Sequence, residues 1–220
     1  MNLKVIITGA TGMVGEGVLH ECLLDSDITE VLIINRRPGG VNHPKLKEVI
    51  HQDFLNFADI AIDFASYQAC FFCLGISSMG ISTAEYYRLT YDLTLHVAKT
   101  MAAQNSEMVF CYVSGSGTDT SEKGLLNWAR VKGKTENDLM QLPFKKAYMF
   151  RPGFLSPTPG LKNTKSYYKY FDWLEPGLKI FFSPFISTLR ELGLAMINAV
   201  KQGYTKQVLK VADIKILAKA

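Results

Sequence analysis

Three glycines, each three residues after the one before, stand near the start of the chain in Thr8-Gly9-Ala10-Thr11-Gly12-Met13-Val14-Gly15. The apolar run before them, residues 5–8, is typical of a strand, and residues 13–24 after them are typical of a helix. A glycine-rich turn between a strand and a helix presents backbone N–H groups and the positive end of the helix dipole, and both attract phosphate. The pattern therefore predicts a seat for the pyrophosphate of a dinucleotide.

Each glycine has a separate predicted role. Gly9 permits the tight turn, Gly12 lets the backbone approach the pyrophosphate, and Gly15 allows the helix to pack close to the sheet. The alternative is a turn that binds nothing, but glycines add no stability of their own. The predicted cofactor contacts in this turn are Gly9, Thr11, Gly12, Met13, Val14 and Gly15.

The end of the second predicted strand distinguishes two cofactors. A carboxylate there would accept a hydrogen bond from the ribose 2′-hydroxyl of NAD, whereas a guanidinium would pair with the 2′-phosphate of NADP. The sequence reads Asn35-Arg36-Arg37, with no acidic residue at this position. NADP(H) is favoured and NAD(H) stays open, the alternative being that one or both arginines are simply solvated.

The elements that must position these residues follow a regular pattern. Short apolar runs alternate with amphipathic stretches, which is typical of βαβ units and a parallel sheet covered on both faces. We predict a single doubly wound α/β Rossmann domain over residues 1–220. The predicted strands are residues 5–8, 31–35, 46–52, 70–74, 108–113, 147–150 and 207–211. The predicted helices are residues 13–24, a long helix after the capping box at residues 82–85, residues 125–142 and residues 189–200.

The composition changes in the C-terminal third, where proline, glycine and aromatic residues gather. We predict that residues 154–188 form a small lid on the substrate side of the domain, with the aromatic segment 167–185 covering a pocket. A membrane-surface or partner-binding role for this segment is the alternative.

Charge and hydropathy exclude several classes of protein. The net charge of +4 comes from 24 basic and 20 acidic residues scattered along the chain, which gives no indication of nucleic-acid binding. No apolar run approaches a membrane span, and no secretory cleavage pattern follows the first residues. We expect a cytoplasmic protein without a membrane span.

The four cysteines include the pair Cys70 and Cys73, which suggests redox or zinc chemistry at first sight. The pair lies inside an apolar strand-like run, where residues three apart point to opposite faces. No second pair or histidine cluster accompanies it. We therefore interpret both as structural residues, and no metal site is predicted.

The N-terminal Thr-Gly-Ala-Thr-Gly-x-x-Gly segment resembles the short-chain dehydrogenase/reductase superfamily, in particular its extended and atypical members. Residues 72–75 (Phe-Cys-Leu-Gly) and 150–153 (Phe-Arg-Pro-Gly) are similar to the Tat-interacting oxidoreductase-like branch and more loosely to NmrA-like sensors. The resemblance covers nearly the whole chain. It implies a nicotinamide dinucleotide along the carboxyl ends of the strands, with further contacts at Asp53, Phe54, Leu74, Gly75, Lys132, Pro152 and Gly153.

Catalysis in that superfamily uses serine, tyrosine and lysine, with tyrosine four residues before lysine on one helix face. Lys132 is in register, but Trp128 occupies the tyrosine position, and an indole N–H cannot serve as a general acid near neutral pH. Either Ser114 or Ser116 would be the serine. The proton would then come from Tyr112, Tyr91, Ser116 or water, or the chemistry would need none.

Two hypotheses of different classes follow. The first is an NADP(H)-dependent oxidoreductase that transfers hydride to or from a small, unidentified carbonyl or hydroxyl compound. The second is a non-catalytic NADP(H)-binding sensor, which Trp128 favours. An epimerase or dehydratase is a third reading, although residues 154–220 leave little room for its substrate domain. A serine hydrolase is disfavoured because neither serine stands in Gly-x-Ser-x-Gly. A protein partner and a homodimer stay open.

Overall fold

A seven-stranded parallel sheet forms the centre of the computed structural model, which describes residues 1–57, 60–163 and 185–220. The strand order is β3-β2-β1-β4-β5-β6-β9, so the order reverses between β1 and β4. Such a reversal opens a crevice at the carboxyl ends of the two strands. The strands are β1 (Leu3–Thr8), β2 (Ile28–Asn35), β3 (Leu46–Ile50), β4 (Ala69–Phe72), β5 (Val109–Val113), β6 (Lys146–Arg151) and β9 (Val208–Lys210).

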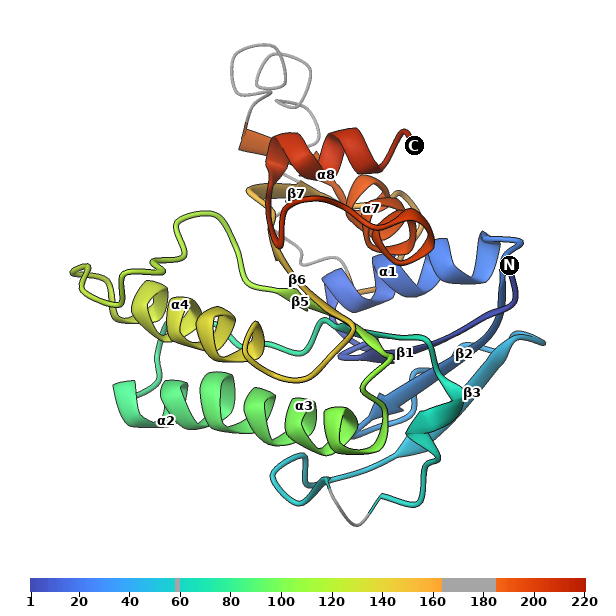
Figure 1. Ribbon diagram of the computed structural model, residues 1–220, viewed down its shortest axis with the longest axis horizontal. Helices are drawn as coiled ribbons and strands as arrows, with labels where there is room; N and C mark the ends of the chain where they lie inside the picture. The colour runs from blue at the N-terminus through green and yellow to red at the C-terminus, as the bar shows by residue number, and fades with distance from the viewer. Residues whose placement is uncertain (58–59, 164–184) are drawn as a thin grey trace.

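Helices cover both faces of this sheet (Figure 1). One face carries α1 (Met13–Leu24), α7 (Leu189–Gln202) and α8 (Val211–Leu217). The other carries α2 (Thr83–Tyr87), α3 (Leu93–Gln104) and α4 (Asn127–Leu139), together with a short 3₁₀ turn, Phe64–Ser66. Each face has its own apolar core, because alternate residues of the buried strands point to opposite sides.

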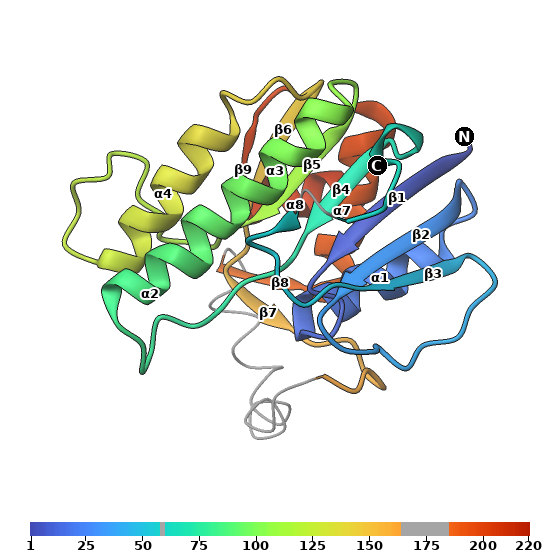
Figure 2. The ribbon, with the colours of Figure 1, turned by 90° about the horizontal axis from the view of Figure 1, so that it is seen from below.

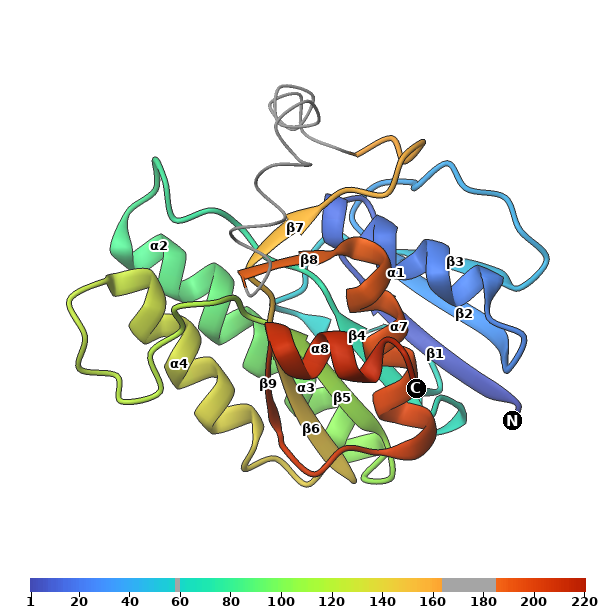
Figure 3. The same cartoon turned by 90° about the horizontal axis from the view of Figure 1, so that it is seen from above.

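A second sheet of two parallel strands, β7 (Phe154–Ser156) and β8 (Ile186–Thr188), lies beyond the carboxyl ends of the main strands (Figures 2 and 3). A β-carbon on Gly153 would lie 1.9 Å from the main-chain oxygen of Phe185, so only glycine permits this approach. The ends of the predicted lid therefore pair with each other. Its aromatic part, residues 167–185, lies outside the described residues except for Phe185.

The fold class is confirmed, and each predicted strand is found within a few residues of its expected bounds. The predicted helix 125–142 is too long at both ends, because Leu126 is an extended N-cap and Leu125 is 98% exposed. The long helix after residue 82 contains a π-helical turn, Arg88–Asp92. Helix α8 was not predicted, although apolar residues three apart, such as Val211 and Ile214, carry its signal.

The structural interpretation of the cysteines agrees with the fold. Cys70 belongs to the core under α3, whereas Cys73 packs against the core under α1. Within residues 1–57, 60–163 and 185–220, no group of three or more potential metal ligands is found. In the same residues, no helix is long and apolar enough to cross a membrane.

Candidate functional site

The three glycines of the first turn meet different steric demands. Gly9 has a φ of 74°, and a β-carbon there would lie 2.8 Å from the Cα of Leu74. A β-carbon on Gly15 would lie 2.2 Å from the main-chain oxygen of Gly9. By contrast, a β-carbon on Gly12 would meet only that oxygen, at 3.4 Å. The fold therefore requires Gly9 and Gly15, whereas Gly12 faces open space.

Helix α1 begins directly after this turn. Gly12 is its N-cap, has an extended backbone and supplies no side-chain cap. The first N–H groups of a helix have no intrahelical acceptor, so those of Met13 and Val14 are available to an anion. The carboxylate of Glu16 in the same turn accepts from the backbone N–H groups of Lys162 and Asn163, at 2.8 and 2.7 Å.

Two adjoining cavities follow the carboxyl ends of β1, β2 and β4. The first, of about 190 Å³, lies against the glycine turn and is lined by Gly9, Thr11, Gly12, Ile34, Asn35, Arg36, Arg37, Cys73, Leu74 and Gly75. The second, of about 160 Å³, is lined by Arg36, Gln52, Asp53, Phe54, Leu55, Leu74, Ile76, Arg88, Leu89 and Leu93. The two share Arg36 and Leu74, so they are neighbours, and together we call them the crevice. Of the predicted contacts up to Gly75, only Met13, Val14 and Gly15 do not line it.

The loop after β2 is anchored from β3. The Glu48 carboxylate accepts from the Asn35 side-chain amide at 2.9 Å and from the Gly39 N–H at 2.8 Å. Arg36 and Arg37 are exposed at the cavity wall. Arg88 also lines the second cavity, but sequence reasoning missed it because it lies mid-helix, where an exposed arginine carries no distinguishing signal.

A second group of predicted residues lies at the ends of β5 and β6. Lys132, on α4, donates a hydrogen bond from its ammonium to the main-chain oxygen of Ser114. Burial lowers the pKa of Lys132 from its ordinary value of 10.5 to about 8, and the negative charge of Glu136 opposes this shift. The amine therefore changes charge close to neutral pH.

The two candidate serines have different environments. Ser114 is buried, and its hydroxyl donates to Oε1 of Glu136 at 2.5 Å while lying 3.2 Å from the main-chain oxygen of Phe150. Ser116 is exposed, and its backbone N–H donates to the oxygen of Pro152 at 2.7 Å. The hydroxyl of Ser116, rather than that of Ser114, is open to a ligand.

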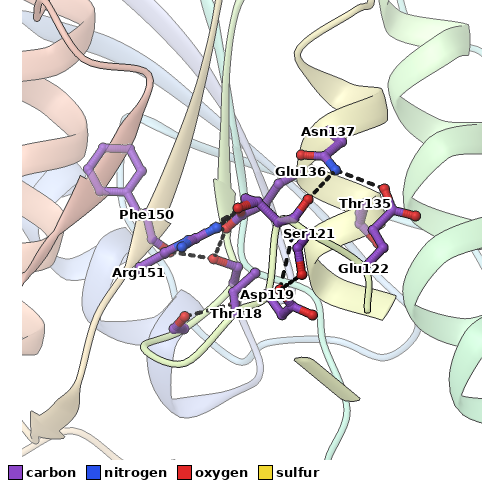
Figure 4. A network of polar contacts seen from close by, with 12 residues as sticks. Thr118, Asp119, Ser121, Glu122, Thr135, Glu136, Asn137, Phe150 and Arg151 are labelled. Carbon is purple, nitrogen blue, oxygen red and sulfur yellow. Dashed lines mark hydrogen bonds and ion pairs between the residues drawn. The ribbon is translucent and has the colours of Figure 1, made fainter. Parts of the chain in front are cut away.

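Glu136, which accepts from the Ser114 hydroxyl, forms a buried ion pair with Arg151 (Figure 4). The guanidinium Nε of Arg151 lies 3.0 Å from Oε1 of Glu136, and Nη2 contacts Oε2. The Glu136 side chain is fully buried and that of Arg151 is 12% exposed. Sequence reasoning missed this pair, although Glu136 stands four residues after Lys132 on the same helix.

Trp128 is half-buried, and its ring packs on Gly117, where an added β-carbon would lie 3.2 Å from the indole Cη2. The two tyrosines considered as proton donors are engaged elsewhere. The Tyr91 hydroxyl donates to Asp138 at 2.5 Å, and burial, with this contact, raises the pKa of Tyr91 to about 12. Tyr112 is buried in the core, which raises its pKa.

The sequence of residues 5–121 matches the model of the family described as the NAD dependent epimerase/dehydratase family. The chain belongs to this family. The matched residues include the glycine turn, the whole lining of both cavities, and Ser114 and Ser116. Lys132, Glu136 and Arg151 lie beyond them.

The chain is also similar to curated proteins over much of its length. The chain is 28% identical over 192 residues to the Leucinostatins biosynthesis cluster protein T of Purpureocillium lilacinum, covering 80% of this chain and 70% of the relative. It is 29% identical over 156 residues to the HTATIP2 protein of Rattus norvegicus, covering 70% and 63% of the two chains.

Solved structures share the fold. Gre2 of Candida albicans, solved in complex with NADPH, superimposes with a TM-score of 0.69 at 14% identity, over 94% of this chain and 77% of that one. UDP-glucuronic acid 4-epimerase of Bacillus cereus, solved with NAD, gives a TM-score of 0.66 at 13% identity, over 95% and 77%.

Proposed function

We propose that the chain binds NADP(H) in the crevice beside the glycine turn and transfers hydride to or from a small carbonyl or hydroxyl compound. The observation that carries the proposal is the pair of cavities between Gly12 and Phe54, which lie at the carboxyl ends of the strands where the strand order reverses. Family membership supports the same assignment.

The residues present fit such a cofactor. A β-carbon on Gly75 would meet nothing within 4 Å, and that on Gly12 would point into the cavity, so the backbone is open where phosphates would approach. Asn35 lines this cavity, and its side-chain oxygen is buried and has no hydrogen-bond partner among the described residues. A buried acceptor without a donor is costly unless a ligand supplies one, and a ribose hydroxyl can do so.

The preference for NADP(H) over NAD(H) rests on charge. Arg36 lines both cavities and Arg37 lines the first, while Arg88, which pairs with Glu85, lines the second. Guanidinium groups pair well with phosphate oxygens. The carboxylate of Glu48, the acidic residue of β3, accepts hydrogen bonds from the Asn35 side chain and the Gly39 N–H.

A bound reduced nicotinamide would supply the hydride. The chain must then deliver a proton to the carbonyl oxygen, and the groups that we propose for this step are Ser116 and Lys132. Ser116 can orient the oxygen through its exposed hydroxyl, and Lys132 can donate a proton because its pKa is about 8. Tyr91 and Tyr112 cannot serve while engaged as described.

A second candidate is an NADP(H)-binding regulatory protein without turnover. Trp128 favours it, because the position that resembles a catalytic tyrosine holds a side chain that cannot transfer a proton near neutral pH.

Binding and turnover distinguish the candidates. Calorimetric titration with NADP+ and NAD+ tests the first step, and we expect Arg36→Ala to weaken NADP+ binding by about tenfold while changing NAD+ binding little. Arg190→Ala is the control, because this arginine is 73% exposed and lies outside the crevice. Binding of neither dinucleotide would refute both candidates.

Oxidation of NADPH with a panel of small carbonyl compounds tests the second step. Turnover supports the oxidoreductase, and an increase in Trp128→Tyr would identify the proton donor as the limiting group. Tight binding with no turnover in either protein supports the regulatory role.

A further inference from the structure

The buried pair of Glu136 and Arg151 lies outside both cavities, yet it connects to Lys132 through a single residue. We propose that Glu136 and Arg151 are positioning residues, which fix Ser114 and thereby the amine of Lys132 and its charge. This inference rests on the proposed function, in which that amine faces the cofactor and substrate.

Ser114 is the connecting residue. Its hydroxyl donates to Glu136, its backbone N–H donates to Phe150 at 2.9 Å, and its main-chain oxygen accepts from the Lys132 ammonium. The side chain of Ser114 is thus held by α4, while its backbone is held by β6. A change in the Ser114 backbone would move the main-chain oxygen that accepts from the Lys132 ammonium.

Arg151 fixes the other side of Glu136. It is the last residue of β6 and directly precedes Pro152, whose oxygen accepts from the Ser116 N–H. The guanidinium binds both carboxylate oxygens, a geometry that fixes orientation as well as distance. One ion pair therefore sets the relative positions of the β5 loop, the end of β6 and α4.

Stability alone does not account for the pair. Removing two charges from water is costly, and well-packed apolar residues often stabilise such a position at least as well. A fully buried Glu136 is better explained by what it does to Lys132. The two are four residues apart on α4, and the negative charge of Glu136 favours the ammonium form against the cost of burial.

The charges around Lys132 are few in the part of the chain that the structure describes. Glu136 acts from the same helix, and Arg151 acts from β6 but pairs with Glu136. Tyr112 on β5 faces the same carboxylate and stays neutral, because burial raises its pKa. Ser114 and Ser116 from the β5 loop carry no charge. Removing the carboxylate should therefore lower the pH at which Lys132 loses its proton.

The test compares the full-length wild type with Glu136→Gln, which keeps the shape and removes the charge. Asp138→Asn is the matched control, because it weakens a half-exposed ion pair with Lys134 on the same helix and keeps an amide oxygen that can accept from Tyr91. The titration of the Lys132 side chain is followed by NMR without cofactor, and NADP+ affinity is measured from pH 6 to pH 9. We expect the Glu136→Gln midpoint to move to lower pH in both measurements, with binding weakened about three- to tenfold at pH 8 and little at pH 6.

A folded Glu136→Gln protein with an unchanged Lys132 midpoint would overturn the inference. Should this variant fail to fold, Ser114→Ala carries the test, because it keeps both charges and removes the connecting hydroxyl. We expect it to weaken NADP+ binding severalfold, and unchanged affinity together with an unchanged lysine titration would refute positioning through Ser114. If the wild type binds no dinucleotide, the proposed function fails, while the NMR titration still decides whether Glu136 controls Lys132.

Discussion

Replacing Lys132 with methionine tests the electrostatics of the site without any ligand. Methionine keeps most of the apolar stem and removes the amine. The folded protein holds the pKa of Lys132 at about 8, whereas the ordinary value is 10.5. The unfolded chain therefore binds this proton more tightly, and the wild type gains stability as the pH rises from 8 to 10.5.

The size of the effect follows from the shift. At about 1.4 kcal/mol per pKa unit, the difference corresponds to about 3 kcal/mol. Part of the side chain is exposed to solvent. Because solvent screens an exposed charge, we expect about 2 kcal/mol. We compare the free energy of unfolding of Lys132→Met with that of the wild type. The variant's value minus the wild-type value should fall by this amount between pH 7 and pH 10.5, and this change does not depend on the difference at pH 7.

Urea unfolding at several pH values measures this difference, in which the titration of other groups largely cancels. Lys134→Met is the control on the same helix. The contact with Asp138 raises the pKa of Lys134, so the stability that this contact contributes is lost only as the pH rises above 10.5. The stability of Lys134→Met minus that of the wild type should therefore stay flat, or change with the opposite sign, from pH 7 to pH 10.5. A difference for Lys132→Met that stays constant from pH 7 to pH 10.5 would refute a desolvated amine.

Three further predictions follow from the packing around the site. Arg151→Met leaves the Glu136 carboxylate buried without its partner and should cost about 3–5 kcal/mol in urea unfolding, whereas a loss below about 1 kcal/mol would show that solvent reaches the carboxylate. Gly15→Ala forces a β-carbon to within 2.2 Å of a backbone oxygen and should lower the melting temperature strongly, so a stable variant would contradict the close approach of α1. Gly12→Ala should change stability by no more than about 1 kcal/mol yet weaken NADP+ binding, and unchanged affinity in calorimetry would remove the glycine turn from the cofactor site.

The sequence predicted the main fold because its signals are local. The turn at Gly9 and the apolar runs of β1, β2 and β4 each carry their information within a few residues. The two-stranded sheet is different, since β7 and β8 pair across about thirty intervening residues and each is only three residues long. A pairing of that kind has no local periodicity from which to predict it.

In the candidate site, the residues of the crevice could be predicted from the sequence, whereas the environment of the two serines could not. The crevice combines loops that each follow a predicted strand, and Arg36, Asp53 and Gly75, which were predicted as contacts, line it. The environment of the serines depends on what α4 and β6 bring to the β5 loop. Nothing near Ser114 in the sequence shows that its hydroxyl is bound by Glu136, or that Arg151 neutralises that carboxylate.

Three features that the fold itself does not need meet at one edge of the sheet. Gly12 faces open space where alanine would fit, Lys132 bears the cost of a desolvated amine, and Glu136 lies fully buried with Arg151. A domain selected only for stability would replace each of them, because helix formers and apolar side chains cost less at such positions. Their common location at the carboxyl ends of β1, β5 and β6 is where a doubly wound sheet binds its ligand. This coincidence is a stronger argument for a binding and reaction site than any one of the motifs alone.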